Sequence, residues 1–305
     1  MAAESKGVLA TLSEELAHAV AAGSAAVVAV DARRRLGASG VIWPEGGVVV
    51  TADHVLERED DISVTLADGT RTAATIAARD PGTDLAILRL SEGAPAPATL
   101  APPDSVKVGH LVLALGRPSG DAPMASFGIV SAIGGTWRTA RGGQIEGYIR
   151  ADVTLYPGFS GGPLVDTQGR IVGLNSYYLA RGQEIALPAA AVSTIVRTLS
   201  TEGRIRRAYL GVTSQPVRLP TGIRELLGSS QEAGLMILSV EADSPAEKGG
   251  LLIGDVLVAV GERSVSDPED LRAALGGSVV DQATSITVVR GGQKQQLAVT
   301  PAERS

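Results

Sequence analysis

The chain has 305 residues, 44% of them hydrophobic and 20% charged, which is the composition of a soluble globular protein with room for two domains. A net charge of −6 at pH 7, without any long Lys/Arg run, argues against nucleic acid as a partner. The lack of cysteine excludes disulfides and thiolate chemistry, and the three histidines lack the close pairing of a zinc site, so we expect no metal.

The first predicted element is an amphipathic helix over residues 8–20. Its apolar side is formed by Val8, Leu9, Leu12, Leu16 and Val20. The uncharged run over residues 19–30 is too short to cross a bilayer, so we expect no membrane span. We interpret this run as the end of the helix, a break at Gly23 and Ser24, and a first strand.

The N-terminal region differs from a secretion signal, which has a basic start followed by a continuous apolar stretch. Here Glu4, Glu14 and Glu15 interrupt the candidate stretch, and no basic start precedes it. We therefore expect no cleaved leader and a cytoplasmic location. The periplasm or another extracytoplasmic compartment is the alternative, because the absence of cysteine fits either.

From residue 24 to residue 187, short apolar runs alternate with Gly, Pro, Asp and Asn breaks at the spacing of an all-β domain. The predicted strands are 26–30, 39–43, 48–51, 62–66, 86–90, 111–115, 129–133 and 171–174. Many short strands with few long helices favour a barrel or sandwich over a doubly wound sheet. Two barrels in tandem would fit the length.

A serine between glycines stands immediately before an apolar run, in Pro157-Gly158-Phe159-Ser160-Gly161-Gly162-Pro163-Leu164. Its hydroxyl is a candidate nucleophile. The glycines let the backbone adopt angles that side chains forbid, so nearby N–H groups can converge on a developing oxyanion. A structural turn between strands explains the same residues about equally well, so the rest of the chain must decide.

Two further residues stand at strand ends. His54 follows the buried run 48–51, and Asp84 leads into the run 86–90. A carboxylate at the start of a buried strand needs a hydrogen-bond donor, and the N–H of a histidine imidazole can be that donor. The alternatives are a lone surface histidine and an aspartate that caps a turn.

Chain order separates two kinds of serine hydrolase. The G-x-S-x-G pattern around Ser160 is also typical of α/β-hydrolases, but their histidine follows the serine, and no histidine follows Ser160. The order His54, Asp84, Ser160 is that of chymotrypsin-like enzymes, whose β-barrels agree with the predicted strands.

Six segments in register resemble the successive signatures of HtrA (Deg) serine proteases over residues 24–200. They are Ser39-Gly40-Val41-Ile42, Thr51-Ala52-Asp53-His54-Val55, Thr83-Asp84-Leu85-Ala86, Gly128-Ile129-Val130-Ser131-Ala132, Pro157-Gly158-Phe159-Ser160-Gly161-Gly162 and Val172-Gly173-Leu174-Asn175-Ser176. The resemblance implies a trypsin-like double β-barrel and an endopeptidase of protein quality control that cleaves unfolded or misfolded polypeptides. It also implies a homotrimer.

On this resemblance, Ser160 attacks the peptide carbonyl, His54 transfers the proton, and Asp84 fixes the imidazole tautomer, without a cofactor. The N–H groups of Gly158 and Ser160 form the oxyanion hole. The predicted substrate contacts are the edge Asn175, Ser176 and Tyr177 and an apolar S1 pocket lined by Leu155 and Leu174. Small aliphatic residues before the cut are then preferred.

Three segments depart from the family pattern. Phe159 stands where asparagine is usual, and the loop 116–120 has Arg117 and Ser119 where asparagine and phenylalanine are common. The segment 183–188 lacks the usual glycines before its alanine. These departures lie beside the elements that set specificity and activation.

Beyond a helix at 192–199 and a polar linker at 201–207, residues 208–305 resemble a PDZ domain, an α+β fold. Its predicted strands are 235–240, 255–260, 285–290 and 296–300, with a helix from Pro268 to Leu275 capped by Asp267. The resemblance implies that Tyr209, Leu210, Gly211 and Val212 bind a peptide carboxylate, and that Met236, Ile237 and Leu238 lie beside the added peptide strand.

The sequence thus predicts a helical segment (1–23), a trypsin-like domain (24–200), a linker (201–207) and a PDZ domain (208–305). Two other functions remain open. A catalytically silent scaffold could bind exposed C-termini through the PDZ domain, but it would be free to lose one of the three catalytic residues. An esterase could use the same triad, although a PDZ domain that binds C-termini favours a polypeptide substrate.

Overall fold

A computed structural model describes residues 7–33, 36–93, 95–139, 141, 143–180, 183–205, 208–228, 230–276 and 279–303. The chain forms two compact units, residues 1–204 and 205–305, and the division falls inside the predicted linker. None of the helices in these ranges is long and apolar enough to cross a membrane.

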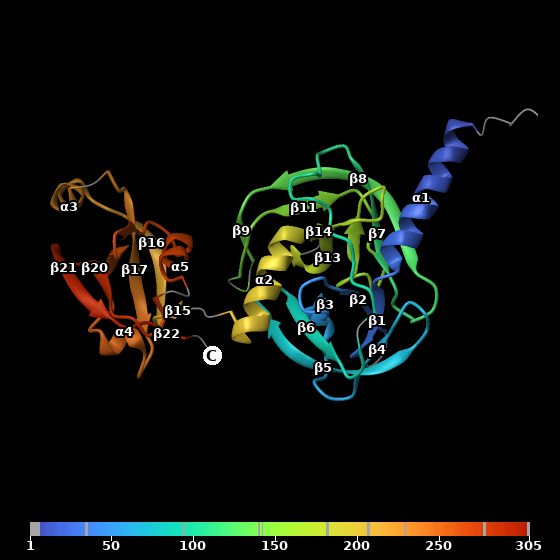
Figure 1. Cartoon of the computed structure of the whole chain (residues 1–305). Coiled ribbons are helices and arrows are strands. Elements are labelled where there is room, and N and C mark those ends of the chain that lie inside the picture. The colour runs from blue at the N-terminus through green and yellow to red at the C-terminus, as the bar shows by residue number, and fades with distance from the viewer. Residues whose placement is uncertain are drawn as a thin grey trace, which may run out of the picture. The chain divides into compact units, whose positions relative to one another are not determined.

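Six antiparallel strands close the first barrel of the N-terminal unit, in the order β1-β2-β3-β6-β5-β4 (Figure 1). Their bounds are β1 Val27–Asp31, β2 Ala38–Ile42, β3 Val49–Ala52, β4 Ile62–Thr65, β5 Arg71–Asp80 and β6 Leu85–Leu90. Val28, Val30, Ile42, Val49 and Leu88 are among the side chains that fill its core, each at most 1% exposed.

A second closed barrel follows, in the order β11-β14-β13-β12-β7-β8. Its strands are β7 Leu111–Gly116, β8 Met124–Gly134, β11 Tyr148–Ala151, β12 Pro163–Val165, β13 Ile171–Ala180 and β14 Gln183–Pro188. A short hairpin, β9 Trp137–Arg138 and β10 Gln144–Ile145, lies between β8 and β11 in the chain. The predicted double barrel is confirmed, and all eight predicted strands are present. Strand β8 begins five residues before its predicted start, and β13 ends six residues beyond its predicted end.

Helix α1, Val8–Ser24, confirms the predicted N-terminal helix and extends it by one turn. Its last turn packs on the second barrel, where a side chain at Gly23 would come within 3.0 Å of Leu115 Cδ1. The start of its apolar side is not covered within the described residues, since Val8 is 84% and Leu9 82% exposed.

Helix α2, Ala189–Glu202, covers part of both barrels. Val192, Val196 and Leu199 are buried, and the helix ends at Gly203, whose φ of 73° suits glycine. Trp43 of the first barrel donates from its indole nitrogen to the hydroxyl of Ser193 at 3.2 Å. These contacts tie the helix to the first barrel.

The C-terminal unit is a sheet in the order β16-β17-β18-β20-β21, with β19 paired to β18 and a separate pair β15-β22. The strands are β15 Ala208–Tyr209, β16 Val212–Arg218, β17 Ala233–Val240, β18 Val256–Val260, β19 Arg263–Ser264, β20 Thr284–Arg290, β21 Gln293–Val299 and β22 Ala302–Glu303. The helices are α3 Thr221–Leu227, α4 Pro245–Lys248 and α5 Pro268–Ala274. Leu235, Ile237, Leu257, Ile286 and Val288 are among the residues of its core.

Two side-chain contacts stabilise this unit, and the first of them was predicted from the sequence. The Asp267 side chain caps α5 by accepting from the Glu269 and Asp270 N–H groups at 2.7 and 2.8 Å, as predicted. Arg290 pairs with the buried Asp255 at 2.7 Å. Burial acts to raise the pKa of Asp255, but the hydrogen bonds from Arg290 and from the Leu252 N–H outweigh it, so this pKa lies below its ordinary value.

The prediction that Met236, Ile237 and Leu238 lie beside an added peptide strand is wrong in its choice of strand. Their strand, β17, is internal, because it pairs with β16 on one side and with β18 on the other. A peptide can extend a sheet only at a free edge. The edge strand that follows the Tyr209–Val212 loop is β16, and α5 contacts it.

Candidate active site

Strand register brings His54 and Asp84 together. β3 and β6 are antiparallel neighbours in which Ala52 pairs with Leu85, so the end of one strand lies beside the start of the other. His54 lies in a single 3-10 turn directly after β3, and Asp84 directly precedes β6 with a φ of 57°. Aspartate is among the few residues that tolerate this left-handed conformation, which suits the position.

The Asp84 carboxylate is 2% exposed and receives three donors. His54 Nδ1 lies 2.9 and 2.8 Å from its two oxygens, and the His54 backbone N–H donates to Oδ1 at 3.0 Å. Ser176 Oγ donates to Oδ2 at 2.7 Å. Since an ionised carboxylate only accepts, the imidazole carries its proton on Nδ1 and leaves Nε2 as an acceptor.

Ser160 lies between β11 and β12 and is 9% exposed. The Gly161 N–H donates to the Asn175 carbonyl at 2.9 Å, which ties this loop to β13. The Tyr177 N–H donates to Ser160 Oγ at 3.3 Å, and no hydrogen bond joins that hydroxyl to His54 in the described structure. Catalytic hydrogen bonds are often long in unliganded sites and tighten when substrate binds.

Glycine is required beside the serine because the first barrel approaches the loop closely. Gly161 has a φ of 83°, and a side chain there would meet the Ser39 carbonyl oxygen at 2.3 Å. The Ser39 N–H in turn lies 3.4 Å from the Ser160 carbonyl oxygen. The nucleophile loop therefore packs against strand β2 of the other barrel.

The turn before Ser160 has the arrangement of an anion-binding loop. The Phe159 N–H donates to the Tyr156 carbonyl at 2.9 Å, and Gly158 has a φ of 89°, which together define a type II turn. The N–H groups of Gly158 and Ser160 donate to no acceptor among the described residues. The free N–H groups of Gly158 and Ser160 therefore stand on either side of the bonded N–H of Phe159.

Ser39 holds this turn in place. Its hydroxyl donates to the Gly158 carbonyl at 2.7 Å and accepts from the Arg117 N–H at 2.8 Å. The Arg117 side chain is buried, and its Nε donates to the Val27 carbonyl at 2.9 Å. Burial lowers the pKa of this guanidinium.

Packing explains why a phenylalanine occupies position 159. Its ring is fully buried in the second barrel and meets Tyr156 edge-on, with ring centroids 5.4 Å apart. It also fills the space beside Gly116, where an added side chain would come within 2.6 Å of it. An aromatic ring here stabilises the loop from the core side.

Sequence reasoning missed the contact of Tyr178 with His54 and the contact of the Ser176 side chain with Asp84. The Tyr178 ring stacks on the imidazole, with centroids 5.2 Å apart and planes at 21°, and Arg141 lies 4.8 Å from the centroid of the tyrosine. The Ser176 hydroxyl serves Asp84, although only a backbone role was predicted for that residue. The available signal was position, since Ser176 is part of the predicted substrate edge and Tyr178 directly follows it.

The predicted substrate contacts separate into two groups. The backbone of Asn175 is already bonded to Gly161 and Gly162, so an open edge begins only beyond it. Leu155 and Asn175 border the same closely packed space inside the second barrel, which has no room for a water molecule in this structure. Leu174 is buried but is not part of that lining, because alternate residues of β13 point to opposite faces.

The predicted carboxylate-binding loop of the C-terminal unit is held by its neighbours. The Ala246 N–H donates to the Leu210 carbonyl at 2.8 Å, and the Glu241 N–H donates to the Gly211 carbonyl at 2.9 Å. Within the described ranges, the N–H groups of Leu210 and Gly211 reach no acceptor. Tyr209 donates its hydroxyl to the Glu241 carboxylate.

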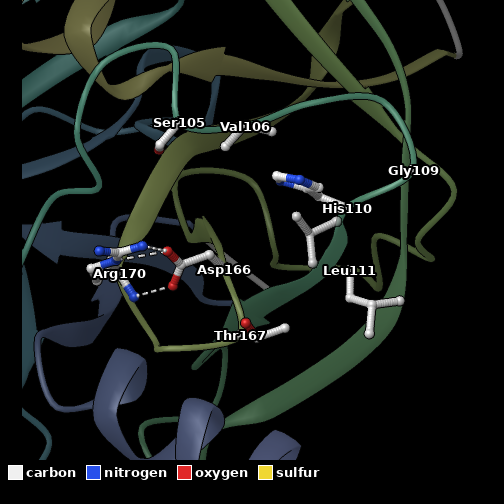
Figure 2. Close-up of a pocket in the computed structure, with 9 residues that line it drawn as sticks. Ser105, Val106, Gly109, His110, Leu111, Asp166, Thr167 and Arg170 are labelled. Atoms are coloured by element: carbon white, nitrogen blue, oxygen red, sulfur yellow. Dashed lines mark hydrogen bonds and ion pairs between the residues drawn. The ribbon is translucent and has the colours of Figure 1, made fainter.

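A separate cavity of about 390 Å³ lies on the second barrel, and Figure 2 shows Asp166 and Arg170 pointing toward one another on one side of it, with His110 on the other. Arg170 pairs with Asp166 at 2.7 Å. None of the three predicted catalytic residues lines this cavity. It therefore lies outside the arrangement described above.

Comparisons with known proteins agree with both units. Residues 38–174 match the trypsin-like peptidase domain, and residues 208–300 match the PDZ domain. A protein of Ectopseudomonas mendocina named probable periplasmic serine endoprotease DegP-like is 35% identical over 268 residues, which cover 86% of this chain and 55% of that protein. The chain thus spans about half the length of the curated relatives it matches. These relatives are named periplasmic, whereas the sequence alone led us to expect a cytoplasmic location.

Solved structures are similar over nearly the whole chain. HtrA-type protease AlgW with decapeptide is 29% identical with a TM-score of 0.75, over 95% of this chain and 99% of that one. HtrA-type protease AlgW with tripeptide is 32% identical with a TM-score of 0.73, over 95% and 97%. At that identity and coverage, the chain belongs to the family of HtrA-type serine proteases.

Proposed function

We propose that this protein is a serine endopeptidase of protein quality control that cleaves unfolded polypeptides, with Ser160 as nucleophile, His54 as general base and Asp84 as the group that orients the imidazole. The observation that carries the proposal is the buried Asp84 carboxylate bonded to His54 Nδ1, which leaves Nε2 on the side available to a hydroxyl.

The remaining catalytic parts are supported by the loop before the nucleophile. The Gly158 and Ser160 N–H groups, free of acceptors in the described structure, are the donors for the tetrahedral oxyanion. Ser39 keeps the Gly158 carbonyl engaged and so holds the turn in one orientation. No step in this chemistry needs a cofactor.

An unfolded substrate fits the approach to Ser160. The Tyr177 N–H faces the serine hydroxyl from β13, where an extended peptide can pair with the strand, but a folded domain rarely offers such a segment. We expect a destabilised variant of a model protein to be cleaved faster than its stable parent. A loss of about 1.4 kcal/mol in substrate stability should raise the rate about tenfold, because the unfolded fraction rises by that factor. Equal cleavage rates would argue for a sequence-specific processing enzyme instead.

We propose that the C-terminal unit captures exposed C-termini, with the carboxylate held by the Leu210 and Gly211 N–H groups and the peptide strand added to the edge of β16. C-terminal amidation removes the negative charge of the carboxylate that this loop would bind. We expect the isolated fragment 205–305 to bind a free-acid peptide with an apolar C-terminus at least about tenfold more tightly than the amide, as measured by fluorescence anisotropy. Equal affinities would show that the loop does not read the carboxylate.

We also propose a homotrimer and a periplasmic location. The exposed apolar residues Val8, Leu9 and Leu12 on α1 support a contact with further copies, and the names of the relatives support the compartment. Light scattering should give three times the chain mass, and a double change of Val8 and Leu9 to Glu should lower it. A monomeric wild-type protein, or its recovery in the cytoplasmic fraction, would remove the respective proposal.

A further inference from the structure

The ring of Tyr178 covers one face of the catalytic imidazole. Ser176 and Tyr178 stand two residues apart on β13. The first bonds to Asp84, and the second stacks on His54. The Tyr178 N–H also donates to Ser176 Oγ at 3.2 Å, which ties these two residues together. The His54 side chain is only 16% exposed, whereas Tyr178 is 46% exposed. A substrate that approaches this side of His54 therefore meets the tyrosine ring first.

Arg141 holds the tyrosine ring in this position. It lies in the turn between β9 and β10, and its Nη2 donates to the Tyr178 hydroxyl oxygen at 2.7 Å. The central carbon of its guanidinium lies 4.8 Å from the centroid of the tyrosine ring, which is the distance of a cation–π contact. The stacking on His54 and the two contacts with Arg141 together keep an exposed ring in one orientation.

The hairpin that carries Arg141 is fixed to the first barrel. Thr139, at the end of β9, is buried and donates from its hydroxyl to the Gly82 carbonyl at 2.6 Å. The Gly143 N–H donates to the same hydroxyl at 3.0 Å, and a side chain at Gly143 would collide with the Gly82 carbonyl oxygen. Gly82 stands two residues before Asp84. The turn with Arg141 therefore has a defined position beside the catalytic pair.

The ring lies on the path of one particular substrate side chain. The Tyr177 N–H lies 3.3 Å from Ser160 Oγ, so a peptide that reaches the serine passes along this part of β13. Side chains alternate along an extended peptide, so the first and second residues before the cut, P1 and P2, point to opposite sides. In a trypsin-like site the P1 side chain points into the second barrel. The P2 side chain then points toward His54 of the first barrel and the ring that covers it.

We propose that Tyr178, held by Arg141, closes the P2 subsite and restricts the second residue before the cut to glycine or alanine. A larger P2 side chain would have to push the ring aside, which breaks its stacking on His54 and both contacts with Arg141. This selection rests on the proposed peptidase function and adds a requirement to it. It leaves the preference at P1 unchanged.

The test uses peptides that differ only at P2, with Gly, Ala, Leu or Phe. For wild type we expect kcat/KM for Ala to exceed that for Leu by about 10- to 100-fold, because Leu must displace the stacked and hydrogen-bonded ring. Tyr178→Ala removes the ring, so the Ala-to-Leu ratio should fall toward one. Tyr178→Phe keeps the stacking but loses the hydroxyl, so it should keep the preference for Ala at reduced strength. Arg141→Ala should lower the ratio about fivefold through the loss of its two contacts.

Arg138→Ala is the matched control, because Arg138 stands on the same hairpin but donates to the Gln144 side chain at 2.9 Å, and it should keep the wild-type ratio. Should Tyr178→Ala fail to fold, the comparison of Arg141→Ala with this control carries the test.

A fluorophosphonate labels a reactive serine whatever the P2 preference, so it separates the two proposals. Normal labelling with equal kcat/KM for Ala and Leu in wild type would overturn the selection at P2. A preference for Ala that survives both Tyr178→Ala and Arg141→Ala would overturn it as well. Loss of labelling and of all cleavage in wild type would overturn the peptidase function, and the selection with it.

Discussion

Replacing Ser160 with alanine is expected to lower casein cleavage on the order of 10⁶-fold in kcat, because the change removes the nucleophilic oxygen and leaves the loop backbone intact. His54→Ala should cost nearly as much, since the hydroxyl is a weak nucleophile without a base. The double variant should be no worse than the poorer single variant, because members of one catalytic unit are strongly non-additive.

Ser91→Ala is the matched control for that series, since Ser91 is exposed and its hydroxyl makes no hydrogen bond in the described structure. It should cleave casein at the wild-type rate. Thermal unfolding of all variants would establish that each is folded. Cleavage that persists in purified Ser160→Ala would leave only the peptide-binding scaffold as an explanation of the fold.

The second large effect is expected for Asp84→Asn, which should lower kcat about 10⁴-fold, the cost of this exchange in a chymotrypsin-type triad. The amide can donate to Nδ1, which favours the imidazole tautomer with its proton on Nε2, where it can no longer accept the serine proton. Asparagine tolerates the left-handed φ of 57° at this position, so the backbone should not change.

Asp104→Asn controls for that backbone conformation, because Asp104 is exposed and has a φ of 58°. It should retain full activity. Ser176→Ala removes one hydrogen bond to the Asp84 carboxylate but keeps its charge, so we expect a smaller loss of about 10-fold. A turnover of Asp84→Asn within tenfold of wild type would mean that Asp84 does not set the tautomer.

The strands that could be predicted from the sequence are those with continuous apolar runs, such as β3 and β6, which are buried on both faces. Strand β5 could not be recognised, because Arg71–Asp80 is rich in alanine and arginine and exposes most of one face, so the apolar alternation is weak. Strand β12 has only three residues, and the four residues of β11 include the exposed Arg150, so neither shows a continuous apolar run of strand length.

The contact between His54 and Asp84 could be anticipated because each stands at a strand end in an order known from chymotrypsin-like enzymes. The ring stacking of Tyr178 on His54 could not, because it depends on the orientation of a side chain at the far end of β13. Likewise, Asn175 and Glu184 come close to one another only because β13 and β14 lie side by side.

The error over Met236, Ile237 and Leu238 has a topological cause. Their apolar run correctly indicated a strand, but a sequence does not show which strands lie at the edge of a sheet. The order β16-β17-β18 makes β17 internal, so only β16 can accept another strand on that side.

Labelling with a fluorophosphonate tests the central claim most directly, because the reagent reacts only with a serine that its surroundings have activated, and no natural substrate is needed. We expect wild-type protein to carry one label, located by peptide mass mapping on the segment that contains Ser160, and the Ser160→Ala variant to carry none. A folded wild-type protein that stays unlabelled, or a label that persists on Ser160→Ala, would contradict the assignment of Ser160 as the nucleophile.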